Sequence, residues 1–211
     1  EQPMTANAQT PQPRDFGFNA DEQALTDVAS KFFQDNLPTQ KLHALVAHDS
    51  DLANGTTAHW DPSMWQQIVD LGWLMIGIPE RAGGLGMSAV AVATLLEQAG
   101  RAALPGPLLP TLNAGFILDA CHSDNADAAL RLICEGKTFS YASCDQFGSW
   151  EHDTSELTLI DGKLNGAVHY VCDAQKVDYF LVNAKLGDDV TLMVVPADAE
   201  GLSIEPNAII D

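Results

Sequence analysis

The chain has 211 residues, 46% of them hydrophobic, so it can bury a sizeable core and does not have the composition of a disordered protein. Its formal net charge is −19, from 29 acidic and 10 basic residues, and such a field repels nucleic acid and anionic membranes. The apolar runs are broken by proline and glycine, so we expect no transmembrane span.

The cysteines and histidines do not indicate a metal site. The four cysteines are widely spaced and form no CxxC pair, which favours free, mostly buried thiols in a reducing cytosol. The six histidines have no metal-ligand spacing either, and we expect surface or structural roles for them. The sequence therefore predicts a cytoplasmic protein without a bound metal.

Helical patterns occupy the first two thirds of the chain. Residues 1–14 hold three prolines and are typical of a flexible leader, and 48–59 is a polar loop. Asn19, with Glu22 three residues later, resembles a capping box. Later helices are expected over 41–47, from Asp61-Pro62 to Gly72, from a cap at Ser88 to Gly100, over 111–120, and from a cap at Asp124 to Gly136. In the helix after Ser88, the apolar face is expected to contain Val90, Ala93, Leu96 and Ala99.

The stretch from Leu71 to Met87 is too apolar and too rich in glycine for an ordinary surface loop. Gly72 can end the preceding helix, because glycine reaches left-handed backbone angles without steric cost. Pro79 prevents a helix from resuming after the apolar run at 73–78. The glycines at 83, 84 and 86 allow the chain to pass close to another backbone or to a ligand.

From Lys137 onward, short runs rich in Val, Thr, Tyr and Phe predict strands. The runs at 155–160 and 163–171 flank Asp161-Gly162, a favoured hairpin turn. A second antiparallel pair is expected over 177–184 and 189–195, and a short strand over 201–204. The predicted fold is therefore α+β, with an N-terminal helical bundle domain at 15–136 and a small antiparallel β-domain at 137–211.

The order of these features resembles a known family. A helix, Leu71-Gly-Trp, an apolar run, Pro79-Glu80, Gly-Gly-Leu-Gly at 83–86 and a second helix ending Leu96-Glu-Gln-Ala-Gly-Arg101 together resemble the N-terminal half of acyl-CoA dehydrogenases. The Leu-Pro-Gly-Pro-Leu-Leu-Pro turn at 104–110 resembles a divergent bacterial branch that includes members acting on steroid or other bulky acyl-CoAs.

Two later stretches carry the second half of the resemblance. The family's loop beside the flavin reads roughly Thr-Glu-Pro, then Gly-Ser-Asp, and here the stretch 141–150 has Cys144, Asp145 and Gln146, then Gly148-Ser149, with a tryptophan in the last position. A further family signature, roughly Asn-Gly-x-Lys-x-Trp-Ile-Thr-Asn, matches 165–173 in spacing. In that stretch Tyr170 replaces the tryptophan and Cys172 replaces the threonine.

The resemblance implies FAD as cofactor and an acyl-CoA as substrate. Tyr170 would supply a wall for the flavin ring, and backbone groups at Ser143, Cys144 and Cys172 would supply hydrogen bonds. A thiol is a weaker partner than the family's hydroxyl, which indicates weakened flavin binding, a different way of holding it, or a stretch that only builds sheet. The residues expected at the cofactor are Tyr141, Ser143, Cys144, Ser149, Tyr170, Val171 and Cys172. Ser149 and Glu97 are the expected substrate contacts. Glu97 is an acid inside a strong helical pattern, between Leu96 and Ala99, and a solvated carboxylate at the helix end is the slightly favoured interpretation of it.

The family's catalytic glutamate belongs to a C-terminal four-helix domain that would follow residue 211. No catalytic residue is therefore assigned in this chain, and the chain is not expected to catalyse dehydrogenation alone. The implied activity is FAD-dependent α,β-dehydrogenation of an acyl-CoA in lipid or steroid side-chain breakdown, by a homo- or hetero-oligomer that passes electrons to a separate acceptor. The alternatives are a non-catalytic subunit that scaffolds an active partner and, less favoured, a free-standing acidic binding module.

Overall fold

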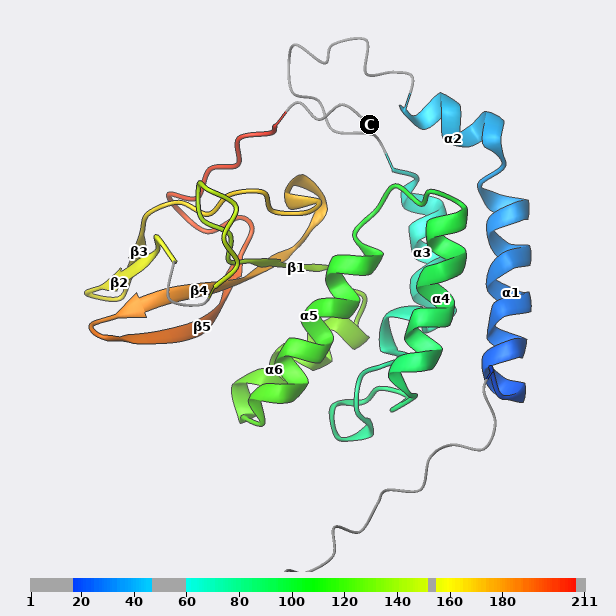
Figure 1. Cartoon of the computed structure of the whole chain (residues 1–211), viewed down its shortest axis with the longest axis horizontal. Coiled ribbons are helices and arrows are strands. Elements are labelled where there is room, and N and C mark those ends of the chain that lie inside the picture. Colours follow the sequence, from blue (N-terminus) through cyan, green and yellow to red (C-terminus); the bar gives the residue numbers. More distant parts are fainter. Residues whose placement is uncertain (1–16, 47–59, 152–154, 208–211) are drawn as a thin grey trace, which may run out of the picture.

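A computed structural model describes residues 17–46, 60–151 and 155–207, so the predicted leader and the polar loop at 48–59 lie outside the described residues. Helices and a five-stranded sheet lie side by side (Figure 1), with α5 and α6 next to the sheet and α1 farthest from it. The expected α+β fold is confirmed. No helix among the described residues is long and apolar enough to cross a membrane.

The helices begin at the capping residues that the sequence offers. Asn19 and Glu22 form the expected capping box, and the Asp61 side chain accepts hydrogen bonds from the first turn of its helix. The last helix is capped by Ser123 and not by Asp124, because the serine hydroxyl reaches the Ala126 N–H. The helices are α1 (Ala20–Asn36), α2 (Thr39–Val46), α3 (Pro62–Asp70), α4 (Ala89–Arg101), α5 (Leu108–Cys121) and α6 (Asp124–Cys134).

The predicted apolar face of α4 is wrong at the start of the helix but right at its end, where Leu96 packs against the core and Ala99 is buried. Val90 is 49% exposed and Ala93 is exposed, while Ala91, Val92 and Leu95 are buried. Small apolar residues fill the first turns of this helix on every side, so helical spacing alone cannot select the face that packs on α1. The helix also runs through Gly100 to Arg101 rather than closing at the glycine.

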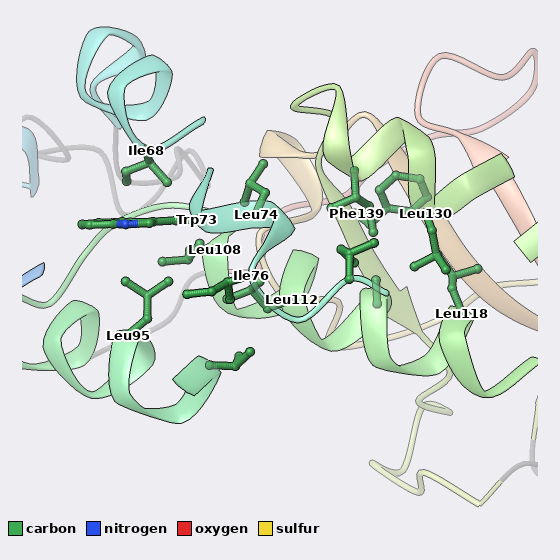
Figure 2. Close-up of a cluster of buried hydrophobic side chains, with 14 of the residues drawn as sticks. Ile68, Trp73, Leu74, Ile76, Leu95, Leu108, Leu112, Leu118, Leu130 and Phe139 are labelled. Carbon is green, nitrogen blue, oxygen red and sulfur yellow. The ribbon is translucent and has the colours of Figure 1, made fainter. Parts of the chain in front are cut away.

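The glycine-rich stretch folds back on itself. Gly72 has φ 72°, and the main chain of 85–87 then hydrogen-bonds to the main chain of 75–78. A Cβ on Gly84 would collide with the Ile78 carbonyl oxygen, so the close approach is to the protein's own backbone. Two short 3-10 turns, Trp73–Met75 and Glu80–Ala82, place Trp73 and Ile76 in the core beside Leu95 and Leu108 (Figure 2).

The sheet is mixed, so the expected purely antiparallel sheet is wrong. β4 (Tyr179–Leu186) pairs antiparallel with β5 (Asp189–Pro196), but it runs parallel to β1 (Phe139–Ala142), and Lys185 at its end pairs in parallel with Thr158 of β2. The long connection between β1 and β4 permits this parallel pairing. β2 (Thr158–Ile160) and β3 (Lys163–Asn165) are shorter than expected, and 201–204 forms no strand.

Both predicted hairpin turns are confirmed. Asp161 and Gly162 both have positive φ, 50° and 75°, as the favoured two-residue turn requires, and they join β2 to β3. The turn between β4 and β5 likewise contains Gly187 at φ 64°.

β1 packs against the helices and is hydrogen-bonded to α5. Phe139 is fully buried beside Leu118 and Leu130 (Figure 2), and the Thr111 hydroxyl of α5 accepts from its N–H at 3.1 Å and donates to its carbonyl at 3.3 Å. The stretch that follows β1 therefore starts from a fixed position. α6 ends at Cys134, shortly before β1, and the division into domains at 15–136 and 137–211 stays a prediction.

Candidate functional site

The two stretches singled out in the β-segment meet just after β1. The His169 N–H donates to the Cys144 carbonyl at 2.9 Å in an isolated antiparallel bridge. The Ser140 hydroxyl donates to the Cys172 carbonyl at 2.7 Å, and the Tyr170 hydroxyl donates to the Gln146 carbonyl at 3.3 Å. Residues more than twenty positions apart are thus joined into one surface.

A buried carboxylate organises the turn at 145–149. Asp145 is 8% exposed, and its Oδ1 accepts from the N–H groups of Phe147 at 2.9 Å and Ser149 at 2.8 Å. The Gly148 N–H donates to the Asp145 carbonyl, and the Asp145 N–H donates to the Ser149 carbonyl. Gly148 has φ 85°, and a Cβ added there would meet nothing within 4 Å, so the turn leaves open space beside it. Asp145 therefore sets the shape of the turn.

The second stretch holds an aromatic ring in an uncommon backbone conformation. Tyr170 has φ 55°, which is rare for a bulky residue and costs about 1–3 kcal/mol. The hydrogen bond from the His169 N–H to Cys144 and the one from Ser140 to the Cys172 carbonyl hold the segment on either side of Tyr170 in place. The ring is 61% exposed, and the His169 imidazole lies 6.1 Å away, centroid to centroid. The geometry therefore presents the tyrosine ring at the surface.

The neighbouring charges are acidic. Glu156 accepts from the Gln146 amide at 3.2 Å and lies 3.5 Å from His169 Nε2. The stretches 141–150 and 165–173 contain no lysine or arginine. The site therefore offers rings and hydrogen-bonding groups but no permanent cation.

Several predicted cofactor residues can contribute only backbone atoms. Ser143 and Cys144 are buried, 8% and 7% exposed. The Tyr141 side chain packs against the helical core, and its hydroxyl accepts from the Asn183 amide at 2.7 Å. Val171 is half-buried in the smaller cluster of the β-segment, and Cys172 is exposed. Their contact with a cofactor stays a prediction.

Glu97 lies away from this cluster and is not buried. Its carboxylate accepts from Arg101 at 2.6 Å, one helical turn on, and its side chain is 44% exposed. The slightly favoured interpretation, a solvated carboxylate, therefore describes its position. α4 is separated from the sheet by α5 (Figure 1).

The sequence did not indicate three exposed apolar side chains, two in the stretch 141–150 and one on α5. Phe147 and Trp150 are 86% and 80% exposed, and Leu109 on α5 is 52% exposed. The exposure of Leu109 could have been predicted, because α5 is apolar on all sides. Such a helix has more apolar residues than one packed face can bury.

The thiols are less buried than expected. Cys144 is buried and Cys134 is half-buried, but Cys121 and Cys172 are exposed, and all four are free. Burial, with a smaller contribution from the Glu135 charge, raises the pKa of the Cys134 thiol. Within the described ranges, no three His, Cys, Asp or Glu residues lie together as metal ligands.

Residues 19–136 match the family description of the acyl-CoA dehydrogenase N-terminal domain. The chain belongs to the acyl-CoA dehydrogenase family. It is 29% identical over 140 residues to the acyl-CoA dehydrogenase FadE28 of Mycobacterium tuberculosis. The matched region covers 65% of this chain and 40% of that protein. It is 28% identical over 148 residues to the probable acyl-CoA dehydrogenase fadE25 of Mycobacterium leprae, covering 64% of this chain and 38% of that one. The chain thus spans about 40% of the length of the curated relatives it matches.

Two solved structures share the fold. A variant of the Tcur3481-Tcur3483 steroid ACAD superposes with a TM-score of 0.71 at 29% identity, over 88% of this chain and 50% of that one. The ChsE4-ChsE5 complex of Mycobacterium tuberculosis gives a TM-score of 0.72 at 17% identity, over 90% of this chain and 51% of that one, and shows the fold alone.

Proposed function

We propose that this chain takes part in the FAD-dependent α,β-dehydrogenation of an acyl-CoA thioester. The observation that carries the proposal is the bridge between Cys144 and His169, since it unites the two stretches that resemble the family's flavin signatures. Membership of the family supports the same chemistry.

The residues at the site fit the ring of a flavin better than its phosphates. The exposed Tyr170 ring offers a flat wall, and the open space at Gly148 allows a close approach to the turn. When bound, FAD supplies the hydride acceptor. Ser149, held by Asp145, would orient the ligand, and the backbone around Cys144 and Cys172 would face its polar edge. The phosphates of FAD and of coenzyme A need local amides or basic groups, and neither stretch contains a lysine or arginine.

An acyl-CoA with a bulky acyl part is the proposed substrate, in lipid or steroid side-chain breakdown in the cytoplasm. The 29% identity to a protein named as a steroid ACAD supports it, as does the resemblance of the turn at 104–110. Ser149 stays the proposed substrate contact in this cluster, and Glu97, which lies away from the cluster on α4, stays a second proposed contact. A separate protein would accept the electrons.

The second candidate is a non-catalytic subunit that completes the site of a dehydrogenase partner. Two observations favour it: Cys144 and Cys172 stand where the family has threonines, and structures with the same fold are named ChsE4-ChsE5 and Tcur3481-Tcur3483, each a pair of names. Both candidates predict an oligomer, and they differ in whether this polypeptide holds FAD itself.

The test is the visible absorption spectrum of the protein purified from its full-length gene, before and after addition of FAD. Bound flavin, bleached anaerobically by an acyl-CoA, is the expected result. Tyr170→Ala should weaken flavin binding, whereas Phe18→Ala, which removes another exposed ring at the start of α1, should leave it unchanged. A protein that stays colourless with FAD contradicts autonomous catalysis and directs the search to a partner subunit.

A further inference from the structure

A groove lies between α1, α2 and α4, away from the sheet and the cluster around Tyr170. The C-terminal ends of α1 and α4 and the start of α2 border this open groove of about 530 Å³, a volume that suits a small molecule. No aspartate or glutamate lines it, although the chain has 29 acidic residues. Its lining includes Phe33, Leu37, Thr39, Gln40, Gln98 and Arg101.

Gln98 is the feature that points to a ligand. It lines the groove and is 4% exposed, and no described residue forms a hydrogen bond with its side-chain amide. The buried Thr94, one turn earlier, does have a partner, because its hydroxyl donates to the Val90 carbonyl at 2.9 Å. A buried amide without a partner is unfavourable and is normally satisfied by protein, water or ligand.

Two positive groups face the same groove. α2 begins there, and the N–H groups of Thr39 and Gln40, its first two residues, have no acceptor within the helix. Arg101 uses one nitrogen of its guanidinium for Glu97, at 2.6 Å, and four of its five N–H donors stay available for other acceptors. Lys41 lies one residue beyond Gln40, but its ammonium is committed to Asp61.

We propose that this groove binds a small anion with carboxylate or phosphate oxygens. The oxygens would accept from the Gln98 amide, the first N–H groups of α2 and the Arg101 guanidinium. The apolar walls at Phe33 and Leu37 leave room for a short aliphatic part. The site is separate from the cluster around Cys144 and Tyr170, and it stands whether or not the chain binds flavin.

The test is a titration of the 15N-labelled 211-residue chain, followed by NMR, with sodium phosphate and separately with sodium butyrate. Sodium chloride at matched ionic strength is the reference. Saturable shifts are expected at the Gln98 side-chain amide and at the backbone amides of Thr39 and Gln40. Saturation by phosphate alone identifies a phosphate site, and saturation by butyrate alone identifies a carboxylate site.

Matched variants complete the test. Gln98→Leu and Arg101→Gln should each raise the dissociation constant about tenfold. Lys163→Gln, which changes the net charge equally on the distant β3, should leave it unchanged. Arg101 is on the surface, so its variant keeps the test valid if Gln98→Leu fails to fold. Shifts no larger than those in chloride, or equal affinities in all variants, would overturn the proposal.

Discussion

The turn at 145–149 depends on one carboxylate, and Asp145→Ala should therefore loosen it. Hydrogen bonds from backbone N–H groups to a charged acceptor contribute about 1.5–3 kcal/mol each. Asp145 accepts two, at 2.9 and 2.8 Å. The freed N–H groups of Phe147 and Ser149 lie in an exposed turn and can bind water, so the net loss should be below the sum, about 2 kcal/mol.

Asp145→Asn is the informative companion variant. It keeps an acceptor oxygen in the same place but loses the charge, and neutral hydrogen bonds are about half as strong, so about 1 kcal/mol should be lost. Urea unfolding followed by circular dichroism measures both changes. Asp188→Ala removes an exposed acid from the turn between β4 and β5 and should change stability by less than about 0.5 kcal/mol. If Asp145→Ala is no less stable than Asp188→Ala, the carboxylate does not organise the turn.

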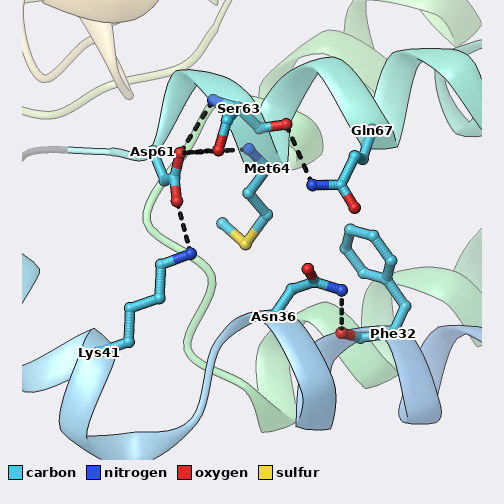
Figure 3. A network of polar contacts seen from close by, with 7 residues as sticks. All are labelled: Phe32, Asn36, Lys41, Asp61, Ser63, Met64 and Gln67. Atoms are coloured by element: carbon cyan, nitrogen blue, oxygen red, sulfur yellow. Dashed lines mark hydrogen bonds and ion pairs between the residues drawn. The ribbon is translucent and has the colours of Figure 1, made fainter.

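Three further predictions concern the scaffold. The Lys41 ammonium and, to a smaller extent, the Ser63 hydroxyl lower the pKa of Asp61 below its ordinary value of 3.8 (Figure 3). The charged Asp61 therefore stabilises the fold above pH 3.8, and this contribution is lost as the pH falls below 3.8 toward the lowered pKa. Asp61→Asn should keep the helix cap but flatten acid unfolding in this range, whereas Asp61→Ala should also cost about 1 kcal/mol at neutral pH, and equal acid profiles in all three proteins would contradict this. Gly84→Ala should destabilise by several kcal/mol, because its Cβ meets backbone, while Gly100→Ala, in open space on α4, should stabilise by about 0.5–1 kcal/mol in the same urea assay. Cys134, whose pKa is raised by burial, should react with a thiol reagent more slowly than the exposed Cys172, as mass spectrometry of timed samples can show.

Local chemistry made much of the fold predictable. The capping box at Asn19 and Glu22, the cap at Asp61 and the turn at Asp161-Gly162 each need only a few neighbouring residues, and all three occur as predicted. The helix stop at Gly72 likewise follows from one residue type in one backbone conformation. These features are encoded within about four positions of sequence.

Features set by distant contacts were not predictable in the same way. The parallel pairing of β1 with β4 joins Phe139 to Tyr179, forty residues apart, and nothing in either strand specifies its direction. The buried face of α4 depends on the position of α1, against which it packs. Of the candidate site, the sequence indicated both stretches, but it did not indicate that Asp145 would shape the turn within the first of them.

The distribution of charge decides what this chain can offer a flavin. Six of its lysines and arginines form ion pairs with its own acids, including Arg81 with Asp119 and Asp127, and Lys176 with Asp173. The two stretches of the candidate site contain no lysine or arginine, and an acid, Glu156, lies there 3.5 Å from His169 Nε2. An apolar ring can be held by an aromatic wall and backbone groups, but a pyrophosphate without a cation is poorly held in a field of net charge −19. The proposed dehydrogenation therefore requires phosphate contacts from outside the two stretches, and the chemistry of the residues itself favours a site shared with other segments or subunits.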